Sequence, residues 1–299
     1  MNTLSRRGLL LTSASGLLAT AFSPAGAAPA HPEKVLAALE RRHGGRLGVA
    51  LRQAGGPLIW GHRADERFAL CSTFKLLLAA AVLRWADQGK LDLQEVLPFQ
   101  DSDWGSHAPV SSQHKAAGGM PALALAKAAQ TTSDNPAANA LLRRLGGPAA
   151  LQAEVRTLGD TVTRIDRWEP EMNRVPPGEV RDTTSPAAMA ATVGRIFGGD
   201  WLKPASRELL AGWTVATETG LMRLRAGLPK TWRVGDKTGT GLHPSMPDQI
   251  NDVAIIWRPG QAPFVLSAYY AAPRAGKSWV TDEHQAVLMA VGRLAARSL

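Results

Sequence analysis

The stretch Ala69-Leu70-Cys71-Ser72-Thr73-Phe74-Lys75-Leu76-Leu77-Leu78 places a hydroxyl and an amine three residues apart at the start of an apolar helical run. At this spacing both side chains lie on the same face of a helix. A serine is a weak nucleophile until its proton is removed, and a neighbouring lysine is one group that can assist. Ser72 and Lys75 are therefore a candidate catalytic pair, and an ordinary helix-capping serine is the alternative.

The same Ser-x-x-Lys spacing occurs a second time, from Ser112 to Lys115. That copy is followed by Ala-Ala-Gly-Gly, and glycine is a poor helix former, so we expect a solvated loop at this position. Spacing alone therefore does not identify a catalytic serine. The assignment of Ser72 depends on what the rest of the chain places beside it.

The N-terminal residues 1–27 have the pattern of a cleaved export signal. Arg6 and Arg7 precede an apolar run over residues 9–22, and an Ala-x-Ala sequence ends at Ala27. Paired arginines are typical of twin-arginine signals, and a general secretory signal is the alternative. The run is shorter than the roughly 20 residues of a membrane span, so we expect no membrane anchor after cleavage. The sequence predicts a periplasmic or secreted bacterial protein.

The composition is that of a soluble globular protein. The chain has 299 residues, of which 45% are hydrophobic and 20% charged, enough for one large domain or two. The formal net charge is +9, but the basic residues are scattered and no nucleic-acid-binding motif is present, so we expect no nucleic-acid partner. A basic surface instead favours anionic substrates. Cysteine occurs once, at Cys71, which excludes an intramolecular disulfide and a cysteine metal cluster.

Hydrophobic periodicity, with the positions of proline and glycine, predicts strands towards both ends of the chain and a block of helices between them. The expected elements are a helix at 32–42; strands at 47–52 and 58–60; helices at 72–85, 121–130, 136–145, 148–158, from 185 onward and at 204–213; strands at 231–235, 253–257 and 264–269; and a helix at about 281–297. We therefore expect an α/β fold: an antiparallel five-stranded sheet flanked by helices, with an inserted all-α domain. We place the α/β domain at residues 28–66 and 214–299, and the all-α domain at residues 67–213.

Three further segments carry polar groups. Ser133-Asp134-Asn135-Pro136 lies between two predicted helices, where these residue types are also ordinary helix-start residues. Lys237-Thr238-Gly239-Thr240-Gly241 follows a predicted strand, and it either ends that strand in a turn or offers a lysine and hydroxyls to a carboxylate. Between residues 164 and 185 the helical pattern disappears, and a loop of this length is more often functional than not.

Taken together and in this order, the motifs that begin at Ser72, Ser133 and Lys237 resemble the three signature motifs of class A serine β-lactamases. The segment Arg167-Trp168-Glu169-Pro170-Glu171-Met172-Asn173 resembles the start of that family's omega loop, here residues 167–182. The resemblance covers essentially the whole predicted mature chain. It implies a monomeric hydrolase of β-lactam antibiotics that needs neither cofactor nor metal, with its active site at the interface of the two domains.

The family's catalytic roles fall on five residues of this sequence. The resemblance implies that Ser72 attacks the lactam carbonyl to form an acyl-enzyme, that Lys75 shares protons with it, and that Glu169 activates the water that releases the product. Ser133 would pass a proton to the lactam nitrogen, with Lys237 beside it. We expect the nearby cation Lys237 to disfavour the charged form of Lys75. Whether Lys75 or Glu169 is the base in acylation stays open.

The resemblance also implies a set of binding residues. Asn135 would bind the amide of the substrate's side chain, Asn173 would hold the water with Glu169, and the backbone N–H groups of Ser72 and Thr240 would form the oxyanion hole. The remaining residues implied in substrate binding are Thr238, Gly239, Arg223 and His107. Arg223 matches an arginine that a subset of the family uses for the substrate carboxylate, and His107 stands where an aromatic side chain often borders the site.

Two positions have a structural part in the resemblance. Arg167 and Asp182 correspond to the salt-bridged ends of the omega loop. In some family members the cysteine before the catalytic serine pairs with a second cysteine just past Lys-Thr-Gly, where this chain has Gly241, so we expect Cys71 to be a small buried hydrophobic residue. The substrate spectrum stays open.

Three other functions are alternatives to a β-lactamase. A penicillin-binding DD-peptidase shares the three motifs but lacks the deacylating glutamate, so Glu169 and Asn173 distinguish the two. A non-catalytic β-lactam sensor would acylate and stop, and the same segment and the predicted absence of an anchor disfavour it. A basic nucleic-acid-binding protein is the weakest alternative, for want of a motif.

Overall fold

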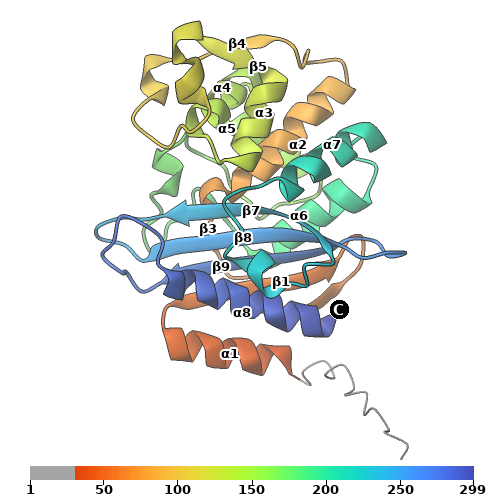
Figure 1. The fold of residues 1–299 in the computed structure, drawn as a ribbon, viewed down its shortest axis with the longest axis vertical. Helices are drawn as coiled ribbons and strands as arrows, with labels where there is room; N and C mark the ends of the chain where they lie inside the picture. Colours follow the sequence, from red (N-terminus) through yellow and green to blue (C-terminus); the bar gives the residue numbers. More distant parts are fainter. Residues whose placement is uncertain (1–30) are drawn as a thin grey trace, which may run out of the picture.

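A five-stranded antiparallel sheet crosses the centre of the molecule, with helices on both faces (Figure 1). The computed structural model describes residues 31–299, so the predicted export signal lies outside the described residues. The strand order is β2-β1-β9-β8-β7. The strands are β1 (Arg46–Gln53), β2 (Leu58–His62), β7 (Arg233–Gly241), β8 (Asp248–Trp257) and β9 (Phe264–Ala272).

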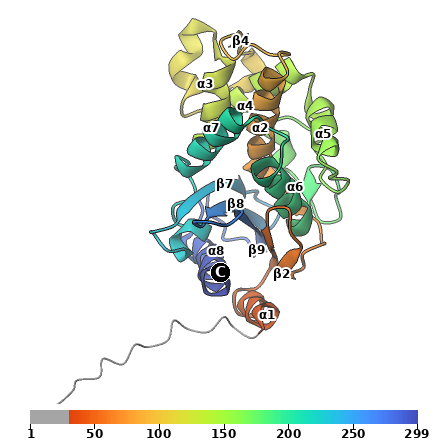
Figure 2. The same ribbon diagram turned by 90° about the vertical axis from the view of Figure 1, so that its right-hand side faces the viewer.

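Two helices from opposite ends of the described chain cover one face of the sheet (Figures 1 and 2). They are α1 (Pro32–His43) and α8 (Asp282–Ser298). The apolar stripe of α8, which includes Leu288 and Val291, packs with Leu36 of α1 and the sheet in one buried cluster. At the start of α8 the Thr281 side chain accepts the His284 N–H, which is the bond that a helix cap supplies.

The helical layer lies on the other face (Figure 2). Its helices are α2 (Phe74–Asp87), α3 (Ala122–Thr131), α4 (Asn135–Leu145), α5 (Pro148–Thr157), α6 (Pro186–Gly198) and α7 (Pro204–Val215). Every residue of α2 from Phe74 to Leu83 is buried, and a helix that is apolar all round is a core helix. The helix α6 packs against the sheet itself, where Ser267 Oγ donates to the Pro186 carbonyl at 2.6 Å.

The fold class predicted from the sequence is confirmed, with three local differences. Ser72 lies in a 3₁₀ turn, η1 (Cys71–Thr73), which precedes α2 rather than belonging to it. The Lys-Thr-Gly motif is part of β7, because the ladder with β8 continues to the pair Gly241 and Gln249. The second Ser-x-x-Lys copy lies in an exposed 3₁₀ helix, η3 (Ser111–Ala117), and not in a loop.

The reason for the η3 helix is a tertiary contact. The Asp134 carboxylate accepts hydrogen bonds from the backbone N–H groups of Val110 (2.9 Å) and Ser111 (2.8 Å) and from Ser111 Oγ (2.6 Å). These bonds satisfy the donors at the start of the turn, and their acceptor comes from a distant part of the chain.

Several short elements were not predicted from the sequence. Two-stranded ladders form between β3 (Phe68–Ala69) and β6 (Thr183–Thr184) and between β4 (Val96–Pro98) and β5 (Gly119–Pro121). Short 3₁₀ turns occur at η2 (Asp101–Asp103), η4 (Glu171–Asn173) and η5 (Leu224–Gly227). Two or three residues are too few to show a periodic pattern. Within residues 31–299, no helix has both the length and the hydropathy needed to cross a membrane.

Glu40 joins α1 to the edge of the sheet. Its carboxylate accepts hydrogen bonds from the Leu47 N–H (2.9 Å) and from Nε (2.7 Å) and Nη2 (2.8 Å) of Arg63. The hydrogen bond from Arg63 is the largest of the effects that lower the pKa of Glu40 from 4.5 to about 2. A carboxyl group whose pKa falls on folding stabilises the fold above its unfolded pKa, and this stability is lost as the pH falls through the folded pKa.

Replacement of Glu40 by Gln is expected to lower the free energy of unfolding by about 1–3 kcal/mol at pH 7, because a charge-assisted bidentate pair is lost. The difference from the wild type should shrink as the pH falls from about 4.5 towards 2, where wild-type Glu40 is itself protonated. Urea unfolding across this pH range measures the effect. Glu33→Gln, on an exposed position of the same helix, is the matched control and should stay near the wild type. A loss that does not vary with pH would contradict the explanation by ion pairing.

Candidate active site

A cleft of about 550 Å³ lies where the helical layer meets strand β7. It is lined by Ser72, His107, Ser133, Asn135, Asn173, Thr219, Arg223, Thr238, Thr240, Ser278, Val280 and Gln285. Eight of these are residues that the sequence singled out, so the structure brings together segments that are far apart in the chain. Its lining is rich in hydroxyl, amide and cationic groups, which suits a polar, anionic ligand.

Ser72 is buried and its hydroxyl faces two ionisable groups. Its Oγ donates to Glu169 Oε1 at 3.1 Å and accepts a hydrogen bond from Lys75 Nζ at 3.1 Å. The side chain makes no capping bond at the start of η1 or α2. The alternative of an ordinary helix-capping serine is therefore wrong, and the hydroxyl lies between an amine and a carboxylate.

Lys75 is fully buried in a ring of acceptors. Its Nζ donates to the Ser133 carbonyl at 2.8 Å and to Asn135 Oδ1, and it forms an ion pair with Glu169 Oε1 at 3.0 Å. Burial lowers the pKa of Lys75, and the charge of Glu169 opposes that shift. The direction expected from the sequence is confirmed, but its main cause is burial and not the neighbouring cation.

Lys237 is the second buried amine. Its Nζ donates to Ser133 Oγ at 3.1 Å and to the Thr238 carbonyl at 2.9 Å. Burial lowers the pKa of Lys237 well below its usual value, and the charge of Lys75 lowers it further. The Ser133 hydroxyl thus has a cation on one side and the cleft on the other, which is the position that a proton relay requires.

The residue Ser133 is held in a strained backbone conformation with φ of +63°. The next residue, Asp134, anchors this turn because it caps α4 through the Ala137 N–H (3.0 Å) and also holds Ser111 through two bonds. The prediction that this motif contains ordinary helix-start residues is therefore correct for Asp134. Its neighbours Ser133 and Asn135 line the cleft instead.

The omega loop presents Glu169 to Ser72 through several anchors. Asn139 of α4 binds the backbone of Glu169 twice, through its N–H (3.1 Å) and its carbonyl (2.9 Å). Asn173 Nδ2 donates to Glu169 Oε2 at 2.5 Å. Arg167 Nε donates to Asp182 Oδ2 at 2.5 Å, which closes the loop at its two ends as expected from the resemblance.

Arg223 lies buried beneath the Lys-Thr-Gly strand. It donates to the carbonyls of Gly239 (3.0 Å) and Asn251 (2.7 Å) and to Thr240 Oγ1 (2.7 Å). Burial lowers the pKa of Arg223, and Asp252 provides the largest opposing effect. The guanidinium still lines the cleft, so it adds a positive charge beside Thr240.

Two other predicted features have clear positions. His107 lines the cleft, with its Nε2 at 2.9 Å from the Thr132 carbonyl. The nearby aromatic side chain of Trp104 packs on Phe99, with ring centroids 5.1 Å apart, and is not part of the cleft lining. Among residues 31–299, no group of three or more histidine, cysteine, aspartate or glutamate side chains is placed to hold a metal ion.

Some residues of the site were not found from the sequence. Asn139 lies four residues after Asn135 on the same helix, and this spacing is a signal that could have identified it. Thr219, whose Oγ1 lies 2.7 Å from that of Thr238, directly precedes the glycine-containing turn before Arg223. Ser278 and Val280 lie in the loop before α8 and Gln285 lies in the first turn of α8, and no local pattern marks them.

Comparison with known proteins identifies the family. A family model described as the Beta-lactamase enzyme family matches residues 31–299. Beta-lactamase L2 of Stenotrophomonas maltophilia is 47% identical over 262 residues, 87% of this chain and 84% of that protein. A β-lactamase of Streptomyces albus G is 43% identical over 285 residues, 89% of this chain and 90% of that protein. The solved structure of an ancestral (GNCA) class A β-lactamase superposes with a TM-score of 0.81 at 51% identity, over 90% of this chain and 100% of that one.

The chain belongs to the class A β-lactamases. The family inferred from the three motifs is thereby confirmed, and with it the class of enzyme, a serine β-lactamase. In this β-lactamase Cys71 is a free, fully buried thiol, as the sequence predicted. A Cβ atom placed on Gly241 would lie 3.1 Å from Cys71 Sγ, so the two positions are close enough for a disulfide in a variant.

Gly241→Cys is expected to form a disulfide with Cys71 under oxidising conditions, because the two side chains would be in contact. The bond closes a long loop, so it should raise the melting temperature above that of Gly241→Ser, the matched control that fits the same space but cannot bridge. Intact mass and thiol titration in denaturant measure bond formation. Two titratable thiols in the oxidised, folded variant would contradict the geometry.

Proposed function

We propose that this β-lactamase hydrolyses β-lactams through a covalent acyl-enzyme on Ser72, which is released by a water molecule that Glu169 activates. The observation that carries the proposal is the position of the Ser72 hydroxyl, 3.1 Å from both Lys75 Nζ and Glu169 Oε1 in a buried site. A hydroxyl with a proton acceptor in hydrogen-bonding distance is the arrangement that nucleophilic catalysis needs.

In acylation, Ser72 Oγ forms a bond with the lactam carbonyl carbon and its proton passes to a neighbouring base. Both candidates for the base, Lys75 and Glu169, lie at the same distance, and the lowered pKa of Lys75 increases the fraction of its neutral form. The C–N bond of the lactam then breaks, Ser133 gives its proton to the nitrogen, and the proton that the base took from Ser72 restores the Ser133 hydroxyl. Lys237, at 3.1 Å from Ser133 Oγ, stabilises the charge on that oxygen.

In deacylation, the Glu169 carboxylate takes a proton from water, and the resulting hydroxide attacks the acyl carbon. The bond between that carbon and Ser72 Oγ then breaks, and Glu169 returns the proton to Oγ. Asn173 holds Oε2 of the carboxylate, and Asn139 fixes its backbone, so that the other oxygen faces Ser72. A carboxylate held 3.1 Å from Ser72 Oγ supports release of the product. Such a base distinguishes a β-lactamase from a DD-peptidase or from a sensor that stays acylated.

The cleft supports recognition of an anionic substrate. Lys237, Thr238, Thr240 and Arg223 would bind the substrate carboxylate, Gly239 would allow the substrate to lie against β7, and Asn135 would bind its side-chain amide. The backbone N–H groups of Ser72 and Thr240 would stabilise the oxyanion. His107 would border the substrate from the opposite wall.

The proposal also covers the setting of the enzyme. We infer that it acts as a monomer, exported by the signal at residues 1–27 to the periplasm or the medium. The predicted division into an α/β domain and an inserted all-α domain places the cleft between the two. No metal or cofactor takes part in the proposed steps.

Glu169→Ala is expected to stop turnover and trap an acyl adduct on Ser72, because acylation retains Lys75 while the base for release is lost. The wild type should hydrolyse a chromogenic cephalosporin with many turnovers, in the presence of a chelator as well. Glu171→Ala, two residues away and exposed, is the matched control and should keep wild-type turnover. Intact mass after incubation with substrate shows the adduct. Normal turnover by Glu169→Ala would contradict the assignment of release, and one stoichiometric burst by the wild type would favour the sensor or the peptidase.

Arg223→Ala is expected to raise KM for carboxylate-bearing β-lactams by about tenfold with a smaller change in kcat, because one charge-assisted contact with the substrate is lost. Arg223→Lys should recover part of the loss, since it keeps the charge without the planar fork. Arg233→Ala, an exposed arginine on the same strand as Lys237, is the matched control. Steady-state kinetics measure the effect. An unchanged KM in a folded Arg223→Ala variant would contradict the role of this residue.

A further inference from the structure

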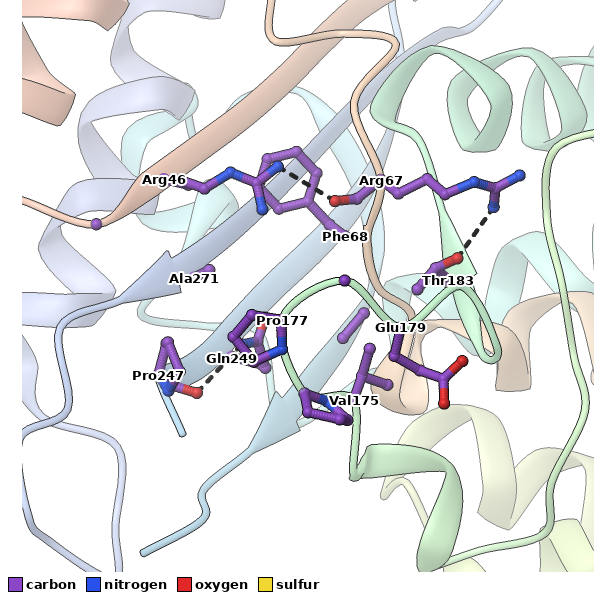
Figure 3. Close-up of a pocket in the computed structure, with 14 residues that line it drawn as sticks. Arg46, Arg67, Phe68, Val175, Pro177, Glu179, Thr183, Pro247, Gln249 and Ala271 are labelled. Atoms are coloured by element: carbon purple, nitrogen blue, oxygen red, sulfur yellow. Dashed lines mark hydrogen bonds between the residues drawn. The ribbon is translucent and has the colours of Figure 1, made fainter. Parts of the chain in front are cut away.

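A second cavity, of about 330 Å³, lies behind the omega loop (Figure 3). It is lined by Gly45, Arg46, Arg67, Phe68, Ala69, Val175, Pro176, Pro177, Gly178, Glu179, Thr183, Pro247, Gln249 and Ala271. The lining shares no residue with the active-site cleft, so this is a separate space. It is built from strand ends at the edge of the sheet on one side and from the second half of the omega loop on the other (Figure 3).

The walls of this cavity are mainly apolar and rigid. Val175, Pro176 and Pro177 form the loop wall, and the Phe68 ring faces the same space from β3. A volume of this size with apolar walls and a few polar groups is typical of pockets for small organic molecules. The proline rings give the loop wall a broad apolar surface, which favours an aromatic ligand.

The charged groups of the cavity have a positive excess. Arg67 Nη1 donates to two neutral acceptors, the Val162 carbonyl (2.9 Å) and Thr183 Oγ1 (3.0 Å), and within residues 31–299 it forms no ion pair. The carboxylate of Glu179 is already bound by Arg181 Nε at 2.9 Å. The cavity's one carboxylate is therefore compensated, and Arg67 is not.

A second guanidinium lies at the same wall. Arg46 lies over the Phe68 ring, with its Cζ 4.5 Å from the ring centroid, and donates to Glu66 Oε2 at 2.8 Å. Glu66 is shared with Arg63, which binds its other oxygen at 2.8 Å and also pairs with Glu40, so two arginines face two carboxylates here and the positive excess of the wall comes from Arg67. Figure 3 shows Arg46 and Arg67 on the side of the cavity opposite Pro247 and Val175.

We propose that this cavity is a binding site for a small aromatic carboxylate. The ring lies against the prolines of the omega loop, and the carboxylate faces the wall that holds Arg46 and Arg67. An anion balances the positive excess of the wall, and an aromatic body fills the apolar volume without ordering many rotatable bonds. The site is independent of the hydrolytic function proposed above.

The test uses 2-naphthoate as the probe and isothermal titration calorimetry with the mature chain, without any β-lactam. One saturable site is expected, and the neutral analogue 2-naphthylmethanol should bind about fivefold more weakly, because it lacks the charge for a partly exposed ion pair. Since no hydrolysis is measured, failure here is distinct from failure of the proposed function. The absence of saturable binding would overturn the proposal.

Variants test whether the probe binds in this cavity. Ala271→Leu fills the cavity and should lower the affinity at least about tenfold, by loss of the space for the ring. Arg46→Gln should weaken 2-naphthoate by about fivefold and leave 2-naphthylmethanol unchanged. The matched controls are Ala205→Leu and Arg42→Gln, which make the same changes at exposed positions outside the cavity and should bind as the wild type does.

Arg223→Ala separates the cavity from the active-site cleft, which also binds carboxylates in the proposed function. The affinity for 2-naphthoate should be unchanged in this variant. A loss in Arg223→Ala would assign the probe to the cleft and overturn the proposal. Wild-type affinity in both Ala271→Leu and Arg46→Gln would overturn it equally. Melting curves show whether each variant is folded. If Ala271→Leu does not fold, the affinity of Arg46→Gln for 2-naphthoate tests the proposal alone.

Discussion

The buried ion pair between Lys75 and Glu169 is the contact on which the rest of the structure depends. Both side chains have no exposed surface, and their charged atoms are 3.0 Å apart. Burying two charges costs several kcal/mol per ion unless their remaining hydrogen-bonding groups also find partners, so a pair like this is not placed for stability alone. It joins the central helix α2 to the omega loop, with the Ser72 hydroxyl at 3.1 Å from each partner.

The surrounding fold keeps this pair in place through fixed polar groups. Lys75 meets the Ser133 carbonyl at 2.8 Å, and Asn139 binds the backbone of Glu169 on both sides. Positive φ angles occur at Cys71, Ser133 and Asp182, which flank the site in three separate segments. Backbone strain of this kind persists only where surrounding contacts over-determine it, so the packing of the helical layer holds the polar groups in their reactive geometry.

The sequence was sufficient for the fold class, because periodicity showed the sheet and the long helices. It also singled out Ser72, Glu169 and Lys237, and the structure places Ser72 against Glu169 and Lys237 against Ser133. Contacts that depend on tertiary structure were not predictable. The 3₁₀ helix at Ser112 forms because Asp134, far along the chain, binds its first donors, and Ser278 lines the cleft from the loop between β9 and α8.

The charge distribution of the cleft supports the proposed binding of a carboxylate-bearing substrate. Lys75, Lys237 and Arg223 are buried cations, and burial lowers the pKa of each. Two buried acids, Asp236 and Asp252, lie diagonally opposite each other on one face of the adjacent strands β7 and β8. Burial raises the pKa of Asp236 to about 6 and that of Asp252 well above its usual value.

Each of these acids lies near a cation: Asp236 accepts a hydrogen bond from Arg225 at 2.7 Å, and the charge of Asp252 opposes the shift that burial causes in the pKa of Arg223. An amine whose pKa is lowered by burial gains more from an incoming anion than a solvated amine does. In the proposed function, a substrate carboxylate beside Lys237 would raise the pKa of that amine. Through linkage, substrate binding would then be coupled to the protonation of Lys237.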